Sequence, residues 1–222
     1  MRKKLWCPKI IDTIAGKAKI TVILPALNEE KTIGKIVQQI KKYAAEVIVV
    51  DDGSSDKTAE KALEQGARVF SHLKNKGYIA ALKTGFVNAK GDIIVVMDAD
   101  GQHDPADVPR LVKPIVDDKA DLVIGARERL SSFSENVITK LTRFKVDTWD
   151  ACSGFKALTR DVAKRMQIRG KCTCGTFILE AHKLGARIMD VKVKNKPRRF
   201  GKSRMKKEHI IQLFLVLKEL LI

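Results

Sequence analysis

The sequence contains few cysteines, few aromatic residues and no long apolar run. Its four cysteines in 222 residues do not make a disulfide framework, and Cys172 and Cys174 form a C-x-C pair without the histidines of a zinc site. Aromatic residues make up 5% of the chain, which leaves little material for stacking nucleic-acid bases. No run approaches the roughly 18 apolar residues of a transmembrane helix, and the basic N-terminus lacks the apolar core of a signal peptide. We therefore expect reduced cytosolic thiols and exclude a polytopic membrane protein.

Acidic residues are scarce relative to basic ones. The chain carries 43 Lys plus Arg against 26 Asp plus Glu, a formal net charge of +17. The excess lies at the ends, with +5 in residues 1–19 and +9 in residues 183–208, whereas residues 20–182 carry only +3. We therefore expect anionic partners, which include nucleic acid, a membrane surface and phosphorylated small molecules.

Buried strands alternate with amphipathic helices along the chain. Near-continuous apolar runs, which are typical of a parallel sheet covered on both faces, predict strands at 20–24, 47–50, 93–97 and 122–124. Helical spacing predicts helices at 29–43, 58–66, 78–89 and 105–118. Asp104 is the expected N-cap of the last of these, with Pro105 at its first position. The alternation predicts an open α/β sheet with its ligands beyond the carboxyl ends of the strands.

The turn after the third of these strands contains two carboxylates and an amide, Asp98, Asp100 and Gln102. Hard oxygen ligands of this kind suit Mg²⁺ or Mn²⁺ shared with substrate phosphates. Asp104 already caps the expected helix, so the turn does not need the carboxylates of Asp98 and Asp100 for capping. We expect a metal site here and expect His103 to be a turn residue.

The turn at 51–56 is also rich in carboxylates. It is either an Asx turn before a helix capped by Ser55 or Asp56, or a site at which a carboxylate accepts hydrogen bonds from a base or a ribose. No G-x-G-x-x-G follows the first strand, which argues against a dinucleotide site. Gly201-Lys202-Ser203 lacks the earlier glycine of a phosphate-binding loop.

Six segments follow in order along the chain, namely VILPALNE (22–29), VVDDGSSD (49–56), MDADGQHDP (97–105), GAR (125–127), DACSGF (150–155) and RRFGKSR (198–204). Together they resemble glycosyltransferase family 2, in particular its polyprenyl-phosphate sugar synthases, which are inverting enzymes. The resemblance covers roughly residues 19–207 and implies the GT-A nucleotide-diphospho-sugar transferase fold, an open, mostly parallel sheet with helices on both faces.

The resemblance also implies roles for individual residues. The base and ribose of the donor nucleotide sugar would lie against Pro25, Leu27, Glu29, Val50 and Asp52. The diphosphate and metal would lie at Asp98, Asp100 and Gln102, with Ala99 beside the nucleotide. Asp100, Arg127 and Asp150 form the expected catalytic set, and the cations that contact the donor and acceptor phosphates are Arg127, Arg198 and Arg204. Relatives usually carry Lys at the position of Arg204, and Arg keeps the charge but changes the geometry.

The implied reaction moves a hexose from a donor of the GDP-mannose or UDP-glucose type to a polyprenyl (dolichyl) phosphate. A phosphate acceptor is already an oxyanion at pH 7, because its second pKa is near 6, so no general base is required. We therefore expect Asp150 to orient the sugar or the metal. The alternative is a family 2 transferase that uses a sugar or polysaccharide acceptor, which would normally carry a carboxylate base pair or a Gln-x-x-Arg-Trp motif.

Two features depart from the family pattern. The stretch between Arg127 and Asp150 is short, and its basic residues, Arg129, Lys140, Arg143 and Lys145, are candidates to replace the missing acceptor-side structure. Glu180 is either the acidic residue that relatives carry before the last strand or a solvated helix residue. A dehalogenase-like phosphatase would place Asp-x-Asp on its first strand. A nucleic-acid binding module would not explain three converging carboxylate clusters, so we expect no nucleic-acid partner.

The expected organisation is a basic extension at 1–18, a transferase domain at 19–207 and an apolar helix at 208–222. That helix either lies at an anionic membrane surface, with Leu213, Phe214, Leu217 and Leu220 in the interface, or packs on the domain's own sheet. If this helix lies at the membrane surface and the acceptor is a polyprenyl phosphate, we expect a cytoplasmic enzyme that is peripheral at the cytoplasmic face of the membrane.

Overall fold

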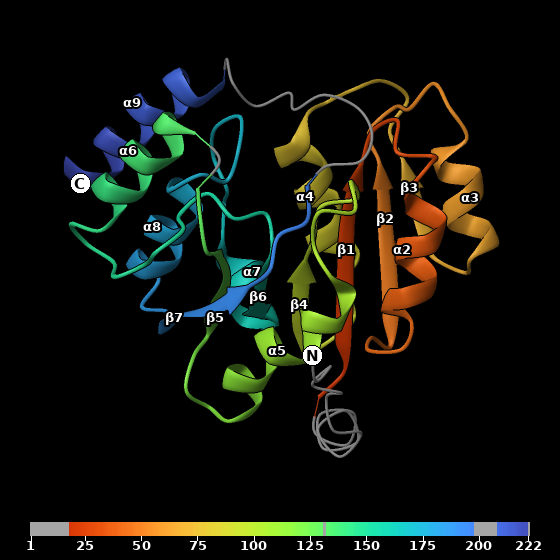
Figure 1. The fold of residues 1–222 in the computed structure, drawn as a ribbon, viewed down its shortest axis with the longest axis horizontal. Helices are drawn as coiled ribbons and strands as arrows, with labels where there is room; N and C mark the ends of the chain where they lie inside the picture. Colours follow the sequence, from red (N-terminus) through yellow and green to blue (C-terminus); the bar gives the residue numbers. More distant parts are fainter. Residues whose placement is uncertain (1–17, 131, 198–207, 222) are drawn as a thin grey trace.

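A seven-stranded sheet forms the middle of the protein in the computed structural model, which describes residues 18–130, 132–197 and 208–221. The strand order is β3-β2-β1-β4-β6-β5-β7 (Figure 1). The strands are β1 (Ile20–Ala26), β2 (Glu46–Asp51), β3 (Arg68–Ser71), β4 (Ile93–Val96), β5 (Leu122–Arg127), β6 (Lys156–Thr159) and β7 (Ile188–Val193). Strand β6 runs antiparallel to β4 and β5, and the other paired strands are parallel.

The four apolar runs form β1, β2, β4 and β5, as the sequence predicts. The sequence did not indicate the other three strands. Strands β3 and β7 lie at the two edges of the sheet and are only partly buried, so they lack a continuous apolar run. Strand β6 is short and begins with Lys156, a residue that rarely lies inside a sheet.

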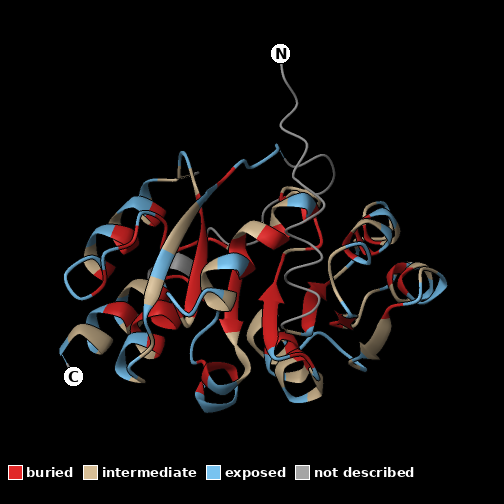
Figure 2. Ribbon diagram, turned by 90° about the horizontal axis from the view of Figure 1, so that it is seen from below, coloured by how far each residue is buried: buried red, intermediate tan, exposed pale blue. Residues whose placement is uncertain are grey.

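Helices cover both faces of the sheet. They are α2 (Ile33–Ile40), α3 (Thr58–Glu64), α4 (Tyr78–Asn88), the 3-10 turn η1 (Pro105–Asp107), α5 (Val108–Val116), α6 (Phe133–Thr142), α7 (Arg160–Arg165), α8 (Thr176–Lys183) and α9 (Glu208–Leu221). Helices α2, α3 and α5 pack on one face, and α4, α6, α7, α8 and α9 contribute to the core on the other. Figure 2 shows the buried strands between helices whose outer surfaces are exposed.

Alternate residues of β1 supply both cores. Val22 and Leu24 pack on the side of α2 and α5, and Ile23 packs on the side of α4. Helix α4 approaches β1 closely because residue 85 is glycine, where a Cβ would collide with Cγ2 of Ile23. Burial of such aliphatic side chains on both faces is the main source of stability in this arrangement, at about 1.5–3 kcal/mol for each.

The C-terminal apolar segment forms helix α9, which lies beside α6 and α8 and not on the sheet (Figure 1). Val216 and Gln212 are buried on its inner face, and the Gln212 amide donates to the carbonyl of Cys174 and to Oγ1 of Thr176. Phe214 and Leu217 are exposed on its outer face, whereas Leu213 and Leu220, which were also expected in the interface, are partly buried against the core. Among the described residues, no helix is long and apolar enough to cross a bilayer.

Candidate active site

The turns that follow β1, β2 and β4 are hydrogen-bonded to one another at the carboxyl edge of the sheet. Asn28, in the left-handed region with a φ of 55°, accepts from the backbone N–H of Ser55 at 2.8 Å, and its own N–H donates to Oγ of Ser54 at 2.9 Å. Oγ1 of Thr32 donates to the carbonyl of Ala99 at 2.7 Å. These contacts bring the turns at 27–30, 52–56 and 98–101 together into one site.

The residues expected at the nucleotide lie on these turns and on the strand ends beside them. Pro25 and Val50 are partners in the β1–β2 register, and Leu27 and Glu29 follow in the first turn. The backbone N–H of Glu29 donates to Oγ1 of Thr58 at 2.8 Å, which fixes this turn to the start of α3. The structure therefore brings these residues to one edge.

The carboxylates of the 51–56 turn accept hydrogen bonds from different parts of the chain. Oδ1 of Asp51 accepts from the N–H of Ser54, and Asp56 accepts from the N–H of Thr58, so both carboxylates stabilise the turn. The N-cap of α3 is Lys57, without a side-chain cap hydrogen bond, and not Ser55 or Asp56 as expected. Asp52 is only 4% exposed. It accepts from the N–H groups of Lys76 and Gly77 at 2.9 and 2.7 Å, and it lies 2.6 Å from Nδ1 of His72. The sequence did not indicate His72 or the turn at 76–77, because β3 was not expected.

Asp98, Asp100 and Gln102 lie on the tight turn after β4. The Asp98 side chain is 35% exposed, whereas Asp100 is buried and accepts from the N–H of Gln102 at 3.0 Å. The N–H of Lys196 donates to the carbonyl of Gln102, so the segment after β7 crosses beside this turn. Within the described residues, no three His, Cys, Asp or Glu side chains gather as a closed metal cluster. Two carboxylates and an amide oxygen fit Mg²⁺ or Mn²⁺, which complete their coordination with water and substrate phosphates.

The surroundings of Asp98 keep it ionised. Burial alone would raise the pKa of its carboxyl, but the contact with His103, the positive charge of Lys156 and the hydroxyl of Tyr78 bring this pKa below the ordinary value. His103 is more than a turn residue, since it is 5% exposed and its ring packs on Phe155 with centroids 5.1 Å apart.

Arg127 and Asp150 form a buried ion pair. Nε of Arg127 donates to Oδ2 of Asp150 at 2.6 Å, and a terminal N–H donates to Oδ1 at 2.9 Å. Glu135 on α6 lies 3.4 Å from the same guanidinium. Burial opposes the charge of Arg127, but the hydrogen bonds and charges of Asp150 and Glu135 raise its pKa above the ordinary value. The partner of Asp150 in this structure is therefore a cation, which the sequence did not indicate.

Several other expectations have clear outcomes. Glu180 is half-buried, and its carboxylate accepts from the N–H groups of Gln167 and Ile168 at 2.5 and 3.0 Å, which ties α8 to the segment after α7. Asp104 accepts from Ala106 as the expected N-cap. The side chains of Cys152, Cys172 and Cys174 are buried and form no disulfide bond. Arg198 and Arg204 lie outside the described residues.

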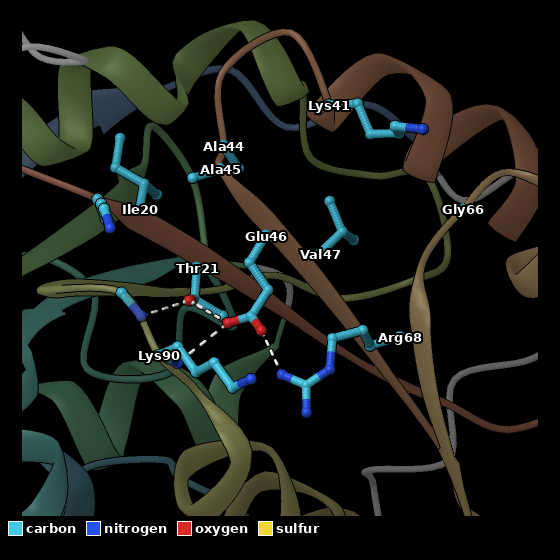
Figure 3. A pocket seen from close by; sticks show the side chains of 12 residues that line it. Ile20, Thr21, Lys41, Ala44, Ala45, Glu46, Val47, Gly66, Arg68 and Lys90 are labelled. Carbon is cyan, nitrogen blue, oxygen red and sulfur yellow. Dashed lines mark hydrogen bonds and ion pairs between the residues drawn. The ribbon is translucent and has the colours of Figure 1, made fainter.

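A cavity of about 640 Å³ lies at the opposite edge, where β1 and β2 begin (Figure 3). The carboxylate of Glu46 lies in its wall and accepts from Oγ1 of Thr21 at 2.6 Å, from the N–H of Lys90 at 3.0 Å and from Arg68. These groups satisfy the carboxylate, and the cavity is separated from the strand-end turns by the length of the sheet. The candidate active site is therefore the carboxyl edge.

Similar proteins show the family of this chain. Residues 21–171 match the family described as Glycosyl transferase family 2. An uncharacterized protein of Methanocaldococcus jannaschii is 37% identical over 200 residues, which cover 81% of this chain and 82% of that protein. The dolichol-phosphate mannosyltransferase of Pyrococcus furiosus is 33% identical over 68% of this chain and 49% of its own length, so the chain spans about half of that relative. The UDP-N-acetylglucosamine–dolichyl-phosphate N-acetylglucosaminyltransferase of Methanococcus voltae is 30% identical over 79% of this chain and 84% of that protein.

Solved structures show the same fold. Glucosyl-3-phosphoglycerate synthase from Mycobacterium tuberculosis, in complex with phosphoglyceric acid, has a TM-score of 0.83 and 24% identity, covering 98% of this chain and 85% of that chain. The same synthase has also been solved with Mn²⁺, uridine diphosphate and phosphoglyceric acid, with a TM-score of 0.82, 24% identity and coverage of 97% of this chain and 83% of that chain. The expected GT-A fold is thus confirmed, and the chain belongs to glycosyl transferase family 2 as a glycosyltransferase.

Proposed function

We propose that this enzyme transfers a hexose, with inversion, from a nucleotide sugar of the GDP-mannose or UDP-glucose type to a polyprenyl phosphate. The observation that carries the proposal is that the 98–102 turn and the Arg127–Asp150 pair lie at the same edge of the sheet, because β4 and β5 both run antiparallel to β6 and so end on the same side. The names of the archaeal relatives, which include two dolichyl-phosphate sugar transferases, support this acceptor class.

In this proposal the turns after β1 and β2 bind the base and ribose, with Pro25, Leu27, Glu29, Val50 and Asp52 as their contacts. Asp98, Asp100 and Gln102 would hold Mg²⁺ or Mn²⁺ beside the diphosphate, close to Ala99. The metal, when bound, would neutralise charge on the leaving diphosphate. Arg127, and the cations Arg198 and Arg204 beyond the described residues, would contact the donor and acceptor phosphates.

The proposed step is a single displacement. An acceptor phosphate oxygen bonds to the anomeric carbon as the bond from that carbon to the β-phosphate oxygen breaks, and the nucleoside diphosphate leaves with the electron pair. The acceptor oxygen carries no proton to be removed at neutral pH. This agrees with Asp150, which is fully buried and accepts hydrogen bonds from Arg127 and from the N–H of Cys152. Asp150 would then act by orienting Arg127.

The test is a matrix of donors and acceptors with the product identified by mass spectrometry. GDP-mannose, UDP-glucose and UDP-N-acetylglucosamine are each incubated with a polyprenyl phosphate, with 3-phosphoglycerate or with a free hexose, in Mn²⁺ and in EDTA. We expect a lipid-linked sugar that forms only with metal. Product on 3-phosphoglycerate or on the hexose, and none on the lipid, would overturn the proposed acceptor.

We also propose that the outer faces of α6 and α9 rest on an anionic bilayer, at the cytoplasmic face of the membrane, where the acceptor resides. Large apolar side chains are exposed on or next to these two adjacent helices, namely Phe133, Phe144, Ile211, Phe214, Leu217 and Leu221. Exposed cations lie among them, namely Lys140, Arg143, Lys145 and Lys218. Apolar side chains that enter the interface beside cations that attract anionic headgroups are typical of peripheral membrane contact. Glu135 on α6 contacts Arg127, so this surface adjoins the proposed phosphate site.

A further inference from the structure

The carboxylate of Asp98 is contacted on both of its oxygens by side chains from other parts of the chain. The hydroxyl of Tyr78 donates to Oδ1 at 3.3 Å. Nε2 of His103 lies 3.5 Å from Oδ2. Nε2 is therefore the ring nitrogen that contacts Asp98, and Nδ1 is buried without a partner among the described residues.

The space behind the carboxylate is closed as well. Gly154 lies directly against Asp98, and a Cβ at this position would collide with Oδ2. The His103 ring is itself fixed by its packing on Phe155. The carboxylate therefore has little room to rotate away from the orientation that Tyr78 and His103 give it.

The backbone just before Tyr78 is hydrogen-bonded to Asp52. It is the first residue of α4, and the residue before it, Gly77, has a φ of 93°. The N–H groups of Lys76 and Gly77 both donate to the buried Asp52 carboxylate, which fixes the start of the helix. The segment 76–78 thus connects Asp52, which is expected at the nucleotide, with Asp98, which is expected at the metal.

From this geometry we infer that Tyr78 is a positioning residue for Asp98, holding the carboxylate in the orientation in which it binds the divalent cation. The inference rests on the metal site of the proposed function. Groups that orient a metal-binding side chain typically contribute about 10- to 100-fold to metal affinity.

The test measures Mn²⁺ binding to the whole chain, by titration with electron paramagnetic resonance detection of free Mn²⁺, with no sugar donor present. Four proteins are compared: the wild type, Tyr78→Phe, Tyr43→Phe and Asp98→Asn. Tyr43 is the other of the two tyrosines in the sequence. It follows α2 and packs against the core, so its variant removes one hydroxyl without touching the site. Thermal unfolding in EDTA checks that the variants fold.

We expect Tyr78→Phe to weaken Mn²⁺ binding by about 10- to 100-fold, Tyr43→Phe to leave it within twofold, and Asp98→Asn to abolish it. An unchanged unfolding temperature of Tyr78→Phe in EDTA would assign the loss to carboxylate orientation. If Tyr78→Phe binds Mn²⁺ like the wild type while Asp98→Asn does not, the inference is wrong and the metal site stands. If the wild type binds no Mn²⁺, both fail.

Discussion

Asp150 accepts two parallel hydrogen bonds from the guanidinium of Arg127, from Nε to Oδ2 at 2.6 Å and from a terminal N–H to Oδ1 at 2.9 Å. Both side chains are buried, the carboxylate completely. A bidentate pair of this kind fixes the plane of the guanidinium as well as its position. Arg127 is therefore presented to the strand-end turns in one orientation.

Asp150→Asn tests whether this carboxylate orients Arg127 or removes a proton. The amide keeps the shape of the side chain but loses the charge and one acceptor, so we expect turnover to fall by no more than about 10⁴-fold, the upper range for a positioned acid–base group. Steady-state kinetics at saturating donor and Mn²⁺ give the value. Asp161→Asn is the control, because Asp161 forms an exposed ion pair with Arg165. A loss of about six orders with donor binding intact would identify Asp150 as an indispensable base and contradict the proposed mechanism.

Membrane contact predicts a loss of vesicle binding when the outer face of α9 is made polar. Phe214 is 68% exposed, and Phe214→Ser removes apolar surface without disturbing the buried Gln212 face. We expect the bound fraction to fall several-fold in flotation with vesicles that contain anionic lipid at low salt.

Val87→Ser is the matched control for this experiment, because Val87 is 85% exposed on α4, on another part of the surface. Its binding should equal that of the wild type. A full chain that does not bind anionic vesicles at low salt would refute the membrane contact.

Glycine at position 85 is required by the packing of α4 on β1. Gly85→Ala would force a methyl group into Ile23, and overpacking of this kind costs about 1–3 kcal/mol of unfolding free energy. Gly34→Ala is the control, because this glycine also lies in a helix but its added Cβ would meet its neighbours at 3.7 Å, an ordinary contact. We expect Gly34→Ala to be neutral or stabilising by about 0.5–1 kcal/mol. Urea unfolding measures both, and equal stabilities for the two variants would contradict the packing argument.

Glu46 should make the stability of the protein depend on pH. Burial would raise the pKa of its carboxyl, but hydrogen bonds from Thr21, Lys90 and Arg68 lower it below 4.5. A carboxyl with a depressed folded-state pKa stabilises the fold above its unfolded pKa, and this stabilisation is lost as the pH falls through the folded pKa. We expect Glu46→Gln to cost about 1.5–3 kcal/mol at pH 7 and much less near pH 3. A difference from the wild type that does not change between these two pH values would exclude this role.

The sequence carried clear signals for the main strands and for the turns that end them. The apolar runs of β1, β2, β4 and β5 are continuous because these strands are covered on both faces. The carboxylates that follow β2 and β4 come to one edge because parallel strands end on the same side of a sheet. Four of the six segments that resemble the family lie at the ends of β1, β2, β4 and β5.

The sequence alone determined which polar turn follows which buried strand. Tertiary structure decided which side chains meet across those turns. Tyr78 contacts Asp98 from the start of α4, where Asp52 accepts from the N–H of Gly77, and Asp150 contacts Arg127 across 23 residues of chain. Helix α9 packs on α6 and α8 with Val216 in the core and with the Gln212 amide donating to Cys174 and Thr176. Local patterns fix strands and turns, but contacts between distant segments depend on how the whole sheet brings their backbones together.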